Sequence, residues 1–166
     1  MMYFVRRGSL EDFTDIANIH FESWGAAYLG LLPESYISNK NNLFEKTEMW
    51  RALIVHHDVV VWVAHDTNHK SLGFIGYFNK NNSYEITTLY VLPEYQRLGI
   101  GTELMKTSLQ DILESNINTH FYLWVLESNT AAIDFYKKFG FVYTGDNSEE
   151  CYEGTKITDI KMVRKK

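Results

Sequence analysis

The stretch from Tyr84 to Leu113 predicts a long strand that passes, through a loop with two glycines, into an amphipathic helix. Apolar and β-branched residues are frequent in Tyr84–Leu92, and Pro93 ends this strand because proline has no N–H to donate to a β-ladder. Beyond the loop, apolar side chains recur every three or four positions, which indicates a helix with one buried face. These side chains are Ile100, Leu104, Met105, Leu109, Ile112 and Leu113.

The periodicity of the remaining sequence predicts a mixed sheet with helices packed on it. Three central strands form a meander, and the later part of the chain alternates strand, helix and strand. The predicted strands are Tyr3–Arg7, Val59–Val63, Leu72–Phe78, Tyr84–Leu92, His120–Leu126, Phe141–Thr144 and Thr155–Met162. The predicted helices cover Leu10–Trp24, Glu34–Val55 in one or two pieces, Ile100–Leu113, and Asn129–Phe139 with Gly140 as its cap. The fold class is therefore α+β, a mixed α/β arrangement.

Length and composition indicate one globular domain over residues 1–166. The formal net charge of −5 makes nucleic acid an unfavourable partner. The longest apolar run, Val59–Ala64, is too short to cross a membrane, and Met1–Arg7 lacks a secretory apolar segment, so we expect a cytoplasmic protein. The single cysteine, Cys151, excludes an intramolecular disulfide. The histidines form no compact helical ligand pair with a carboxylate, so no metal is predicted.

The loop Gln96–Thr102 has the composition of a phosphate-binding helix start. The first N–H groups of a helix are unpaired and carry a partial positive charge, so they attract anions. Gly99 and Gly101 have no side chain to block a ligand, and both can take a positive φ that points amides inward. A dinucleotide loop would need a third glycine where Leu104 stands, and a P-loop would need Lys after the last glycine. On physical grounds alone, a purely structural tight turn remains an alternative.

Two motifs in the second half of the chain together resemble the GNAT superfamily of acetyltransferases. Gln96-Arg-Leu-Gly99-Ile-Gly101 is similar to the family's Q/R-x-x-G-x-G/A acetyl-CoA motif. The segment Trp124–Phe141 is similar to its second motif, an Asn at a strand end followed by a helix with a Tyr and then Gly-Phe. The resemblance implies a six- to seven-stranded, mostly antiparallel mixed sheet with about four helices. A nucleotide-binding oxidoreductase is disfavoured because the third glycine is missing.

The resemblance implies acetyl-CoA as co-substrate, with no metal, and assigns residues to it. Backbone amides of the loop would hold the pyrophosphate, and pantetheine would pair with Leu89 and Val91 as an additional strand. The Val91 N–H is then a candidate oxyanion donor. The full cofactor set predicted is Leu89, Val91, Gln96, Arg97, Leu98, Gly99, Ile100, Gly101, Thr102, Asn129 and Tyr136.

Tyr136 and Glu85 are the side chains predicted to take part in catalysis together with Val91. In the family the tyrosine acts as general acid toward the CoA thiolate. A phenol is a weaker acid than a thiol, so we expect Tyr136 mainly to hydrogen-bond the developing thiolate. Glu85 precedes Leu89 by four residues on the same strand and is a candidate general base, with a solvated strand-end carboxylate as the alternative.

The N-terminal helix is predicted to supply the acceptor site. His20–Pro33 resembles the segment that builds an amine pocket in family members, and Glu22, Trp24 and Tyr28 would hold a cation there by charge and aromatic faces. Packing of these aromatics in a core or interface is the alternative. We expect a small-molecule primary amine as acceptor. A protein or peptide amine and a non-catalytic acyl-CoA-binding module are the alternatives, and a homodimer is compatible with the sequence.

Overall fold

The computed structural model describes residues 1–80, 83–115 and 120–164, which form a seven-stranded sheet in the order β1-β2-β3-β4-β5-β7-β6. The strands are β1 (Tyr3–Arg7), β2 (Val59–Asp66), β3 (Ser71–Lys80), β4 (Ser83–Val91), β5 (His120–Leu126), β6 (Val142–Tyr152) and β7 (Thr155–Arg164). Neighbouring strands are antiparallel except for the β4–β5 pair. The mixed, mostly antiparallel sheet of the prediction is thus confirmed.

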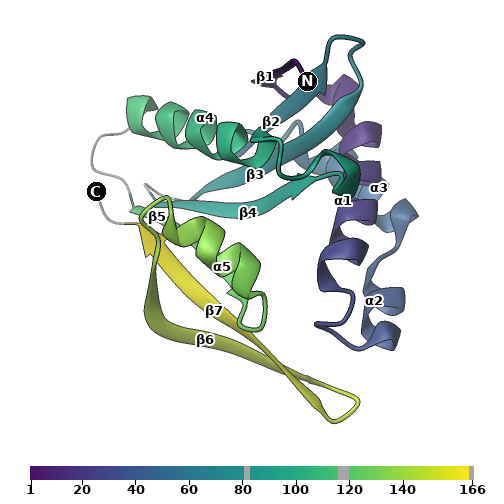
Figure 1. Ribbon diagram of the computed structural model, residues 1–166, viewed down its shortest axis with the longest axis vertical. Coiled ribbons are helices and arrows are strands. Elements are labelled where there is room, and N and C mark those ends of the chain that lie inside the picture. Colours follow the sequence, from purple (N-terminus) through teal and green to yellow (C-terminus); the bar gives the residue numbers. More distant parts are fainter. Residues whose placement is uncertain (81–82, 116–119, 165–166) are drawn as a thin grey trace.

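The structure has five α-helices, of which α4 and α5 pack on one face of the sheet and α1 and α3 on the other (Figure 1). They are α1 (Phe13–Tyr28), α2 (Glu34–Lys40), α3 (Leu43–Leu53), α4 (Ile100–Ser115) and α5 (Thr130–Lys137). Two short 3-10 turns, η1 (Leu10–Asp12) and η2 (Pro93–Tyr95), precede α1 and α4. About four helices were predicted; the fifth arises because Asn41 and Asn42 divide the predicted helical region, with Asn42 capping α3.

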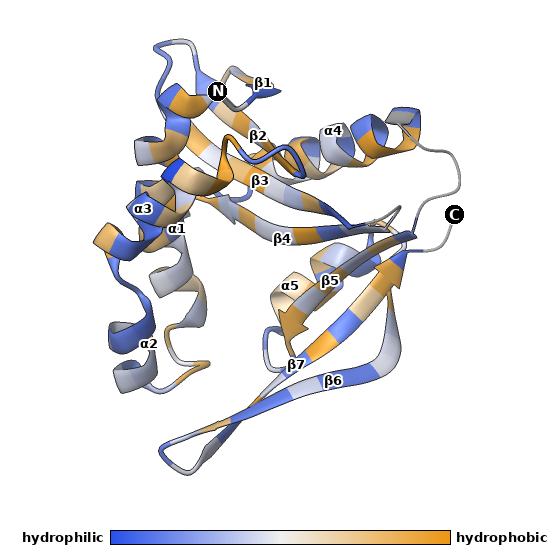
Figure 2. Cartoon of the chain, turned by 180° about the vertical axis from the view of Figure 1, so that it is seen from behind, coloured by the Kyte–Doolittle hydropathy of each residue, from blue (hydrophilic) through white to orange (hydrophobic). Residues whose placement is uncertain are grey.

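Each face of the sheet has its own hydrophobic core. One core lies beneath α4 and includes Leu104, Met105, Phe121 and Phe141, all at most 1% exposed. The other lies beneath α1 and α3 and includes Trp50 and Phe74. Alternating hydrophobic and hydrophilic residues along the strands match this two-sided arrangement (Figure 2).

The sheet opens between β4 and β5. The two strands pair in parallel only from Ser83–Ile86 to His120–Leu123, whereas on its other edge β5 pairs with β7 from Phe121 to Leu126. A bulge on β4 lies at the same level: Thr88 pairs with Gly76 and Ile86 with Tyr77, so Thr87 is the extra residue. The bulge bends β4 where it leaves β5, and a gap forms toward the end of both strands.

The C-terminal hairpin differs most from the sequence prediction. The predicted strand Phe141–Thr144 is too short, because β6 extends to Tyr152, with an irregular register between Tyr143 and Asn147. This edge strand is almost wholly exposed and largely hydrophilic (Figure 2), so it carries no buried-face pattern that could reveal it. Gly140 has a φ of +83°, as expected for the cap after α5.

Candidate active site

A cavity of about 830 Å³ occupies the gap between β4 and β5. The Gln96–Thr102 loop, the first turns of α5 and the end of α1 complete its walls. The lining residues come from several elements. From α1 they are Ser23, Ala26, Ala27 and Tyr28; from β4 Ile86, Thr87, Thr88, Leu89, Tyr90 and Val91; from the turn and loop before α4 and from its first residues Pro93, Tyr95, Gln96, Arg97, Gly99, Gly101 and Thr102; from β5 Trp124 and Val125; and from α5 and its flanking residues Asn129, Ala131, Ala132, Phe135, Tyr136 and Lys138.

The loop before α4 turns through two residues with positive φ. Arg97 has a φ of +62° and Gly99 one of +87°, so the chain winds tightly into the helix start. Gly101 was also expected to be able to take a positive φ, but it lies within the first turn of α4. Gly101 instead leaves room for a ligand, because a Cβ built there would lie on the cavity side, 3.8 Å from Val91 and 3.9 Å from Phe135. The helix start is therefore open to an anion, and its role in binding a phosphate group stays a prediction.

The backbone of β4 presents unpaired groups to the gap. The N–H of Leu92 donates to the Leu72 carbonyl on β3 at 2.9 Å, so the groups of Val91 and Leu89 point the other way, toward β5. At this level β5 no longer pairs with β4. The Gln96 side-chain amide donates to the Val91 carbonyl at 3.1 Å. The N–H groups of Leu89 and Val91 thus lie where an extended ligand can pair with them.

Most of the predicted cofactor residues meet in this cavity. Leu98 and Ile100 do not line it: Leu98 is 48% exposed, and Ile100 is buried in the core beneath α4. Only their backbone groups can contribute to the helix start. Asn129 lines the cavity and caps α5, with its Oδ1 accepting from the Ala132 N–H at 3.1 Å. Its amide NH₂ is then the side-chain group that can address a ligand.

Three tyrosines from three elements surround the middle of the cavity. Tyr28 comes from α1, Tyr90 from β4 and Tyr136 from α5, and each is half-buried. Burial raises the pKa of all three phenols, with Tyr28 adding to the effect on Tyr136 and on Tyr90. All three therefore remain protonated across the physiological pH range. Tyr28 and Tyr136 are residues that the sequence predicts at the site, whereas Tyr90 is not, because its place in the alternation along β4 is typical of ordinary core packing.

Tyr90 rests on a buried histidine. The His20 ring stacks on that of Tyr90 with centroids 5.0 Å apart, and its Nδ1 accepts from Trp50 Nε1 at 3.0 Å. Burial lowers the pKa of His20 to about 3, with a smaller effect from Lys46, so the imidazole is neutral at physiological pH. His20 therefore supports the wall of the cavity and does not supply a base.

Glu85, the predicted general base, lies outside the cavity lining. Its carboxylate accepts from Lys80 Nζ at 2.5 Å and from the Tyr122 hydroxyl at 2.9 Å. It lies before the bulge, in the part of β4 that still pairs with β5. The structure therefore does not bring Glu85 together with Tyr136 and Val91.

Of the three predicted acceptor residues, only Tyr28 lines the cavity. Glu22 is exposed, and Trp24 packs against Tyr28 with ring centroids 4.8 Å apart while Lys46 Nζ lies 5.1 Å above its ring. Sequence reasoning missed Thr87, Thr88 and Trp124 on this side of the cavity. The bulge brings Thr87 and Thr88 there, and no sequence motif predicts this bulge.

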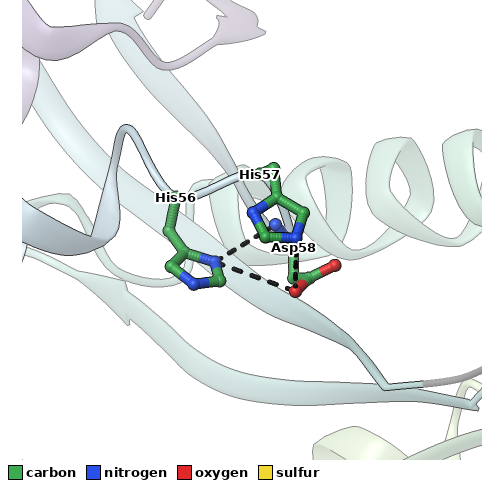
Figure 3. Close-up of side chains that lie close together, drawn as sticks. All are labelled: His56, His57 and Asp58. Carbon is green, nitrogen blue, oxygen red and sulfur yellow. Dashed lines mark hydrogen bonds and ion pairs between the residues drawn. The ribbon is translucent and has the colours of Figure 1, made fainter.

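Within the described ranges, one group of three side chains has the spacing of metal ligands, and it lies elsewhere. His56, His57 and Asp58 gather at the turn before β2, and His57 Nε2 is 3.1 Å from Asp58 Oδ2 (Figure 3). His56 Nδ1 accepts from the Asp58 N–H at 3.2 Å, and both imidazoles are exposed. None of the three lines the cavity, so this group has no part in the site.

Comparison with solved structures agrees with the geometry of the cavity. The PaiA N-acetyltransferase of Thermoplasma acidophilum, in complex with coenzyme A, has the same fold, with a TM-score of 0.82. It is 27% identical, and the match covers 100% of each chain. The fold and the site thus define an acetyl-CoA-dependent N-acetyltransferase.

The chain belongs to the GNAT acetyltransferase family, whose model matches residues 14–141. The uncharacterized N-acetyltransferase YuaI of Bacillus subtilis is 31% identical over 143 residues, which are 83% of this chain and 79% of that protein. N-alpha-acetyltransferase 50 of Danio rerio is 46% identical over 80 residues, which are 48% of this chain and 47% of that protein. In the part of the chain that the structure describes, no helix is long and apolar enough to span a membrane.

Proposed function

We propose that this enzyme transfers the acetyl group of acetyl-CoA to the primary amine of a small molecule. The supporting observation is the cavity whose lining includes both residues of the Gln96–Thr102 loop and Tyr28 on α1. Its volume of about 830 Å³ is in the range of small-ligand sites, and the thioester arm of the co-substrate takes part of that space. The remainder at the α1 end suits a small acceptor.

A bridge between α2 and the β6–β7 hairpin borders the acceptor end. Ser35 Oγ donates to Glu153 Oε2 at 2.9 Å, and Asn39 Nδ2 donates to the Tyr152 hydroxyl at 2.6 Å. Between them, the Tyr36 hydroxyl donates to Glu150 Oε1. Tyr36 belongs to α2, which begins six residues after Tyr28, the last residue of α1, so the bridge lies on the α1 side of the cavity. A bridge in this position limits the approach of a bulky acceptor.

The residues of the cavity suit the individual steps of acetyl transfer. Acetyl-CoA supplies an activated acyl carbon on a thiol leaving group. The Val91 N–H faces the gap and can stabilise the negative charge that develops on the acyl oxygen. The Tyr136 hydroxyl stays protonated because its pKa is raised by burial, so it can donate a hydrogen bond to the departing sulfur.

An α-amino group of a peptide is the second candidate acceptor. The similarity to N-alpha-acetyltransferase 50 of Danio rerio supports it, as does a 43% identical match over 56 residues to an N-alpha-acetyltransferase of Sulfurisphaera tokodaii. That second match covers 34% of each protein, so it leaves the acceptor end undetermined.

The two candidates are separated by thiol release from acetyl-CoA with matched acceptors. We expect n-butylamine and 1,4-diaminobutane to give a higher kcat/KM than a tetrapeptide with a free amino terminus. Asn39→Ala opens the bridge on the surface and should raise the relative rate with the peptide. Turnover of the tetrapeptide alone by the wild-type enzyme would replace the small-molecule proposal with the peptide one.

The role of Glu85 as general base remains a prediction with a direct test. Glu85→Gln should lower kcat/KM most near neutral pH and progressively less in alkali, where the amine is already deprotonated. Tyr122→Phe is the matched control because it removes one hydrogen bond from Glu85 and keeps the carboxylate. Equal pH profiles for wild type and Glu85→Gln would exclude this role.

A further inference from the structure

The turn between α3 and β2 brings two imidazoles and a carboxylate together, away from the cavity. His57 Nε2 lies 3.1 Å from Asp58 Oδ2, and His56 Nδ1 lies 4.0 Å from the same oxygen (Figure 3). The three candidate ligand atoms all lie within 4.8 Å of one another. Acetyl transfer has no use for these side chains at the cavity, so their grouping calls for another explanation.

Backbone hydrogen bonds fix this turn on both sides. The His56 N–H donates to the Leu53 carbonyl at the end of α3, and the His56 carbonyl accepts from the Val59 N–H at the start of β2, each at 3.0 Å. The Asp58 carbonyl accepts from the Asn79 N–H on β3 at 2.8 Å. The backbone that carries the three side chains is therefore ordered before any ligand binds, which lowers the entropic cost of binding.

A second pair of stacked histidines shows what distinguishes this turn. The His65 and His69 rings lie 5.7 Å apart, and Asp66 follows His65 directly in the sequence. The Asp66 carboxylate, however, accepts from two backbone N–H groups of its own turn, at 2.8 and 2.9 Å. In the described part of the chain, the Asp58 carboxylate instead has its ion pairs with the two neighbouring imidazoles. Its oxygens are thus directed at the histidines and not at the backbone.

We propose that His56, His57 and Asp58 form a binding site for a divalent transition-metal ion such as Zn²⁺. Imidazole nitrogens favour Zn²⁺, Ni²⁺ and Cu²⁺, whereas Mg²⁺ and Ca²⁺ require oxygen ligands. The site follows the C-terminus of α3, and the partial negative charge of a helix C-terminus also favours a cation. This inference is independent of the proposed acetyl transfer.

The observed distances are close to those that a metal ion needs. Zn²⁺ binds nitrogen and oxygen at about 2.0–2.2 Å, so neighbouring ligand atoms in a tetrahedral site are about 3.3 Å apart. The distance from His57 Nε2 to Asp58 Oδ2 already fits. The His56 ring must turn closer, and its Nδ1 exchanges the hydrogen bond from the Asp58 N–H, now 3.2 Å long, for the metal. Both imidazoles are exposed, so they can turn without disturbing the core, and water completes the coordination.

Calorimetric titration of the full chain with ZnCl₂ tests the site. The protein carries no histidine tag, has been treated with a chelator, and has Cys151→Ser to remove its exposed thiol. We expect one Zn²⁺ to bind per chain and no binding of Mg²⁺. His57→Gln and Asp58→Asn should each weaken Zn²⁺ binding by more than tenfold, since even an outer partner of a metal ligand commonly contributes about 10- to 100-fold to affinity. His57 is 84% exposed, so its replacement leaves the core intact.

His69→Asn is the matched control, because it removes an exposed histidine of the other stacked pair. Asparagine tolerates the φ of +64° at that position, and Zn²⁺ binding should stay at the wild-type level. Absence of Zn²⁺ binding, unchanged binding in His57→Gln, or an equal loss in His69→Asn would each overturn the site. Thiol release by the metal-free enzyme should be the same in His57→Gln and in the protein with His57. Absence of turnover in both would overturn the proposed function and leave the metal site intact.

Discussion

The proposed cofactor end and the proposed acceptor end of the cavity consist of different chemical groups. The cofactor end consists mainly of backbone groups: the helix start after Gly99 and the N–H groups of Leu89 and Val91. The acceptor end consists of side chains from α1, β4 and β5, among them Tyr28, Thr88 and Trp124. Backbone groups are the same in every residue, so many different sequences can form the proposed cofactor end if they form the same turn and strand. Side chains at the proposed acceptor end can change one by one, so we expect that end to set specificity.

Tyr136 joins the two ends, and its removal should have the largest effect. Tyr136→Phe deletes a hydrogen-bond donor from the thiolate position, and loss of one such donor costs about 10²–10³-fold in kcat. KM for acetyl-CoA should change little, because the interaction strengthens only as the sulfur becomes charged. Steady-state thiol release at saturating substrates measures this. An unchanged kcat would remove Tyr136 from the chemistry.

His20 tests how far the acceptor end depends on the buried core. Its folded-state pKa of about 3 lies below the usual 6.5, so the unfolded chain binds the extra proton between these values. Its contribution to stability is complete above pH 6.5 and is lost as the pH falls toward 3. Between pH 6.5 and 5, urea unfolding should show the wild type losing about 2 kcal/mol more than His20→Gln.

Gln at position 20 is chosen because its side-chain oxygen can still accept from Trp50 Nε1. The other histidines are present in both proteins, so their contributions cancel in the difference. Parallel stability curves for the two proteins would show that His20 is not the source of the acid sensitivity.

Gly101→Ala should stabilise the folded protein but weaken the binding of acetyl-CoA. Gly101 lies in α4, where alanine is favoured over glycine by up to about 1 kcal/mol, so the variant should unfold at a higher temperature. The added methyl enters the space beside Val91 and Phe135 and should raise KM for acetyl-CoA about tenfold, a loss of about 1.4 kcal/mol. Thermal unfolding and thiol release measure the two effects. A raised KM for the amine alone would contradict the assignment.

Breaking the bridge between α2 and the β6–β7 hairpin should have the smallest effect on the kinetics. Tyr36→Phe removes the hydrogen bond to Glu150, and one such bond between exposed groups contributes about 1 kcal/mol. We expect KM for the amine to change about fivefold, with KM for acetyl-CoA unchanged. Tyr143→Phe, an exposed phenol on the same hairpin outside the cavity, is the comparison. Equal changes of the KM for the amine in both variants would show that the bridge does not affect acceptor binding.

Local sequence patterns predicted the elements well wherever a buried face or a turn residue marked them. The strand ending at Pro93, the helix from Ile100 and the Gly140 cap each depend on residues adjacent in the chain. Prediction was poorer for β6, whose polar, exposed residues show no periodicity. It was also poorer for the acceptor end, where Glu22 and Trp24 were expected but only Tyr28 lines the cavity.

The sequence by itself determined the strand–turn–helix unit and the glycines that shape its loop, because a helix start and a strand end are local structures. These are the elements of the predicted acetyl-CoA end of the site. Only the tertiary structure decided which side chains line the proposed acceptor end. The bulge at Thr87 and the parting of β4 from β5 bring Tyr28, Tyr90 and Tyr136 around one cavity, although they are far apart in the chain. The same parting leaves Glu85 on the paired side, engaged by Lys80, because position along a strand does not reveal where that strand loses its partner.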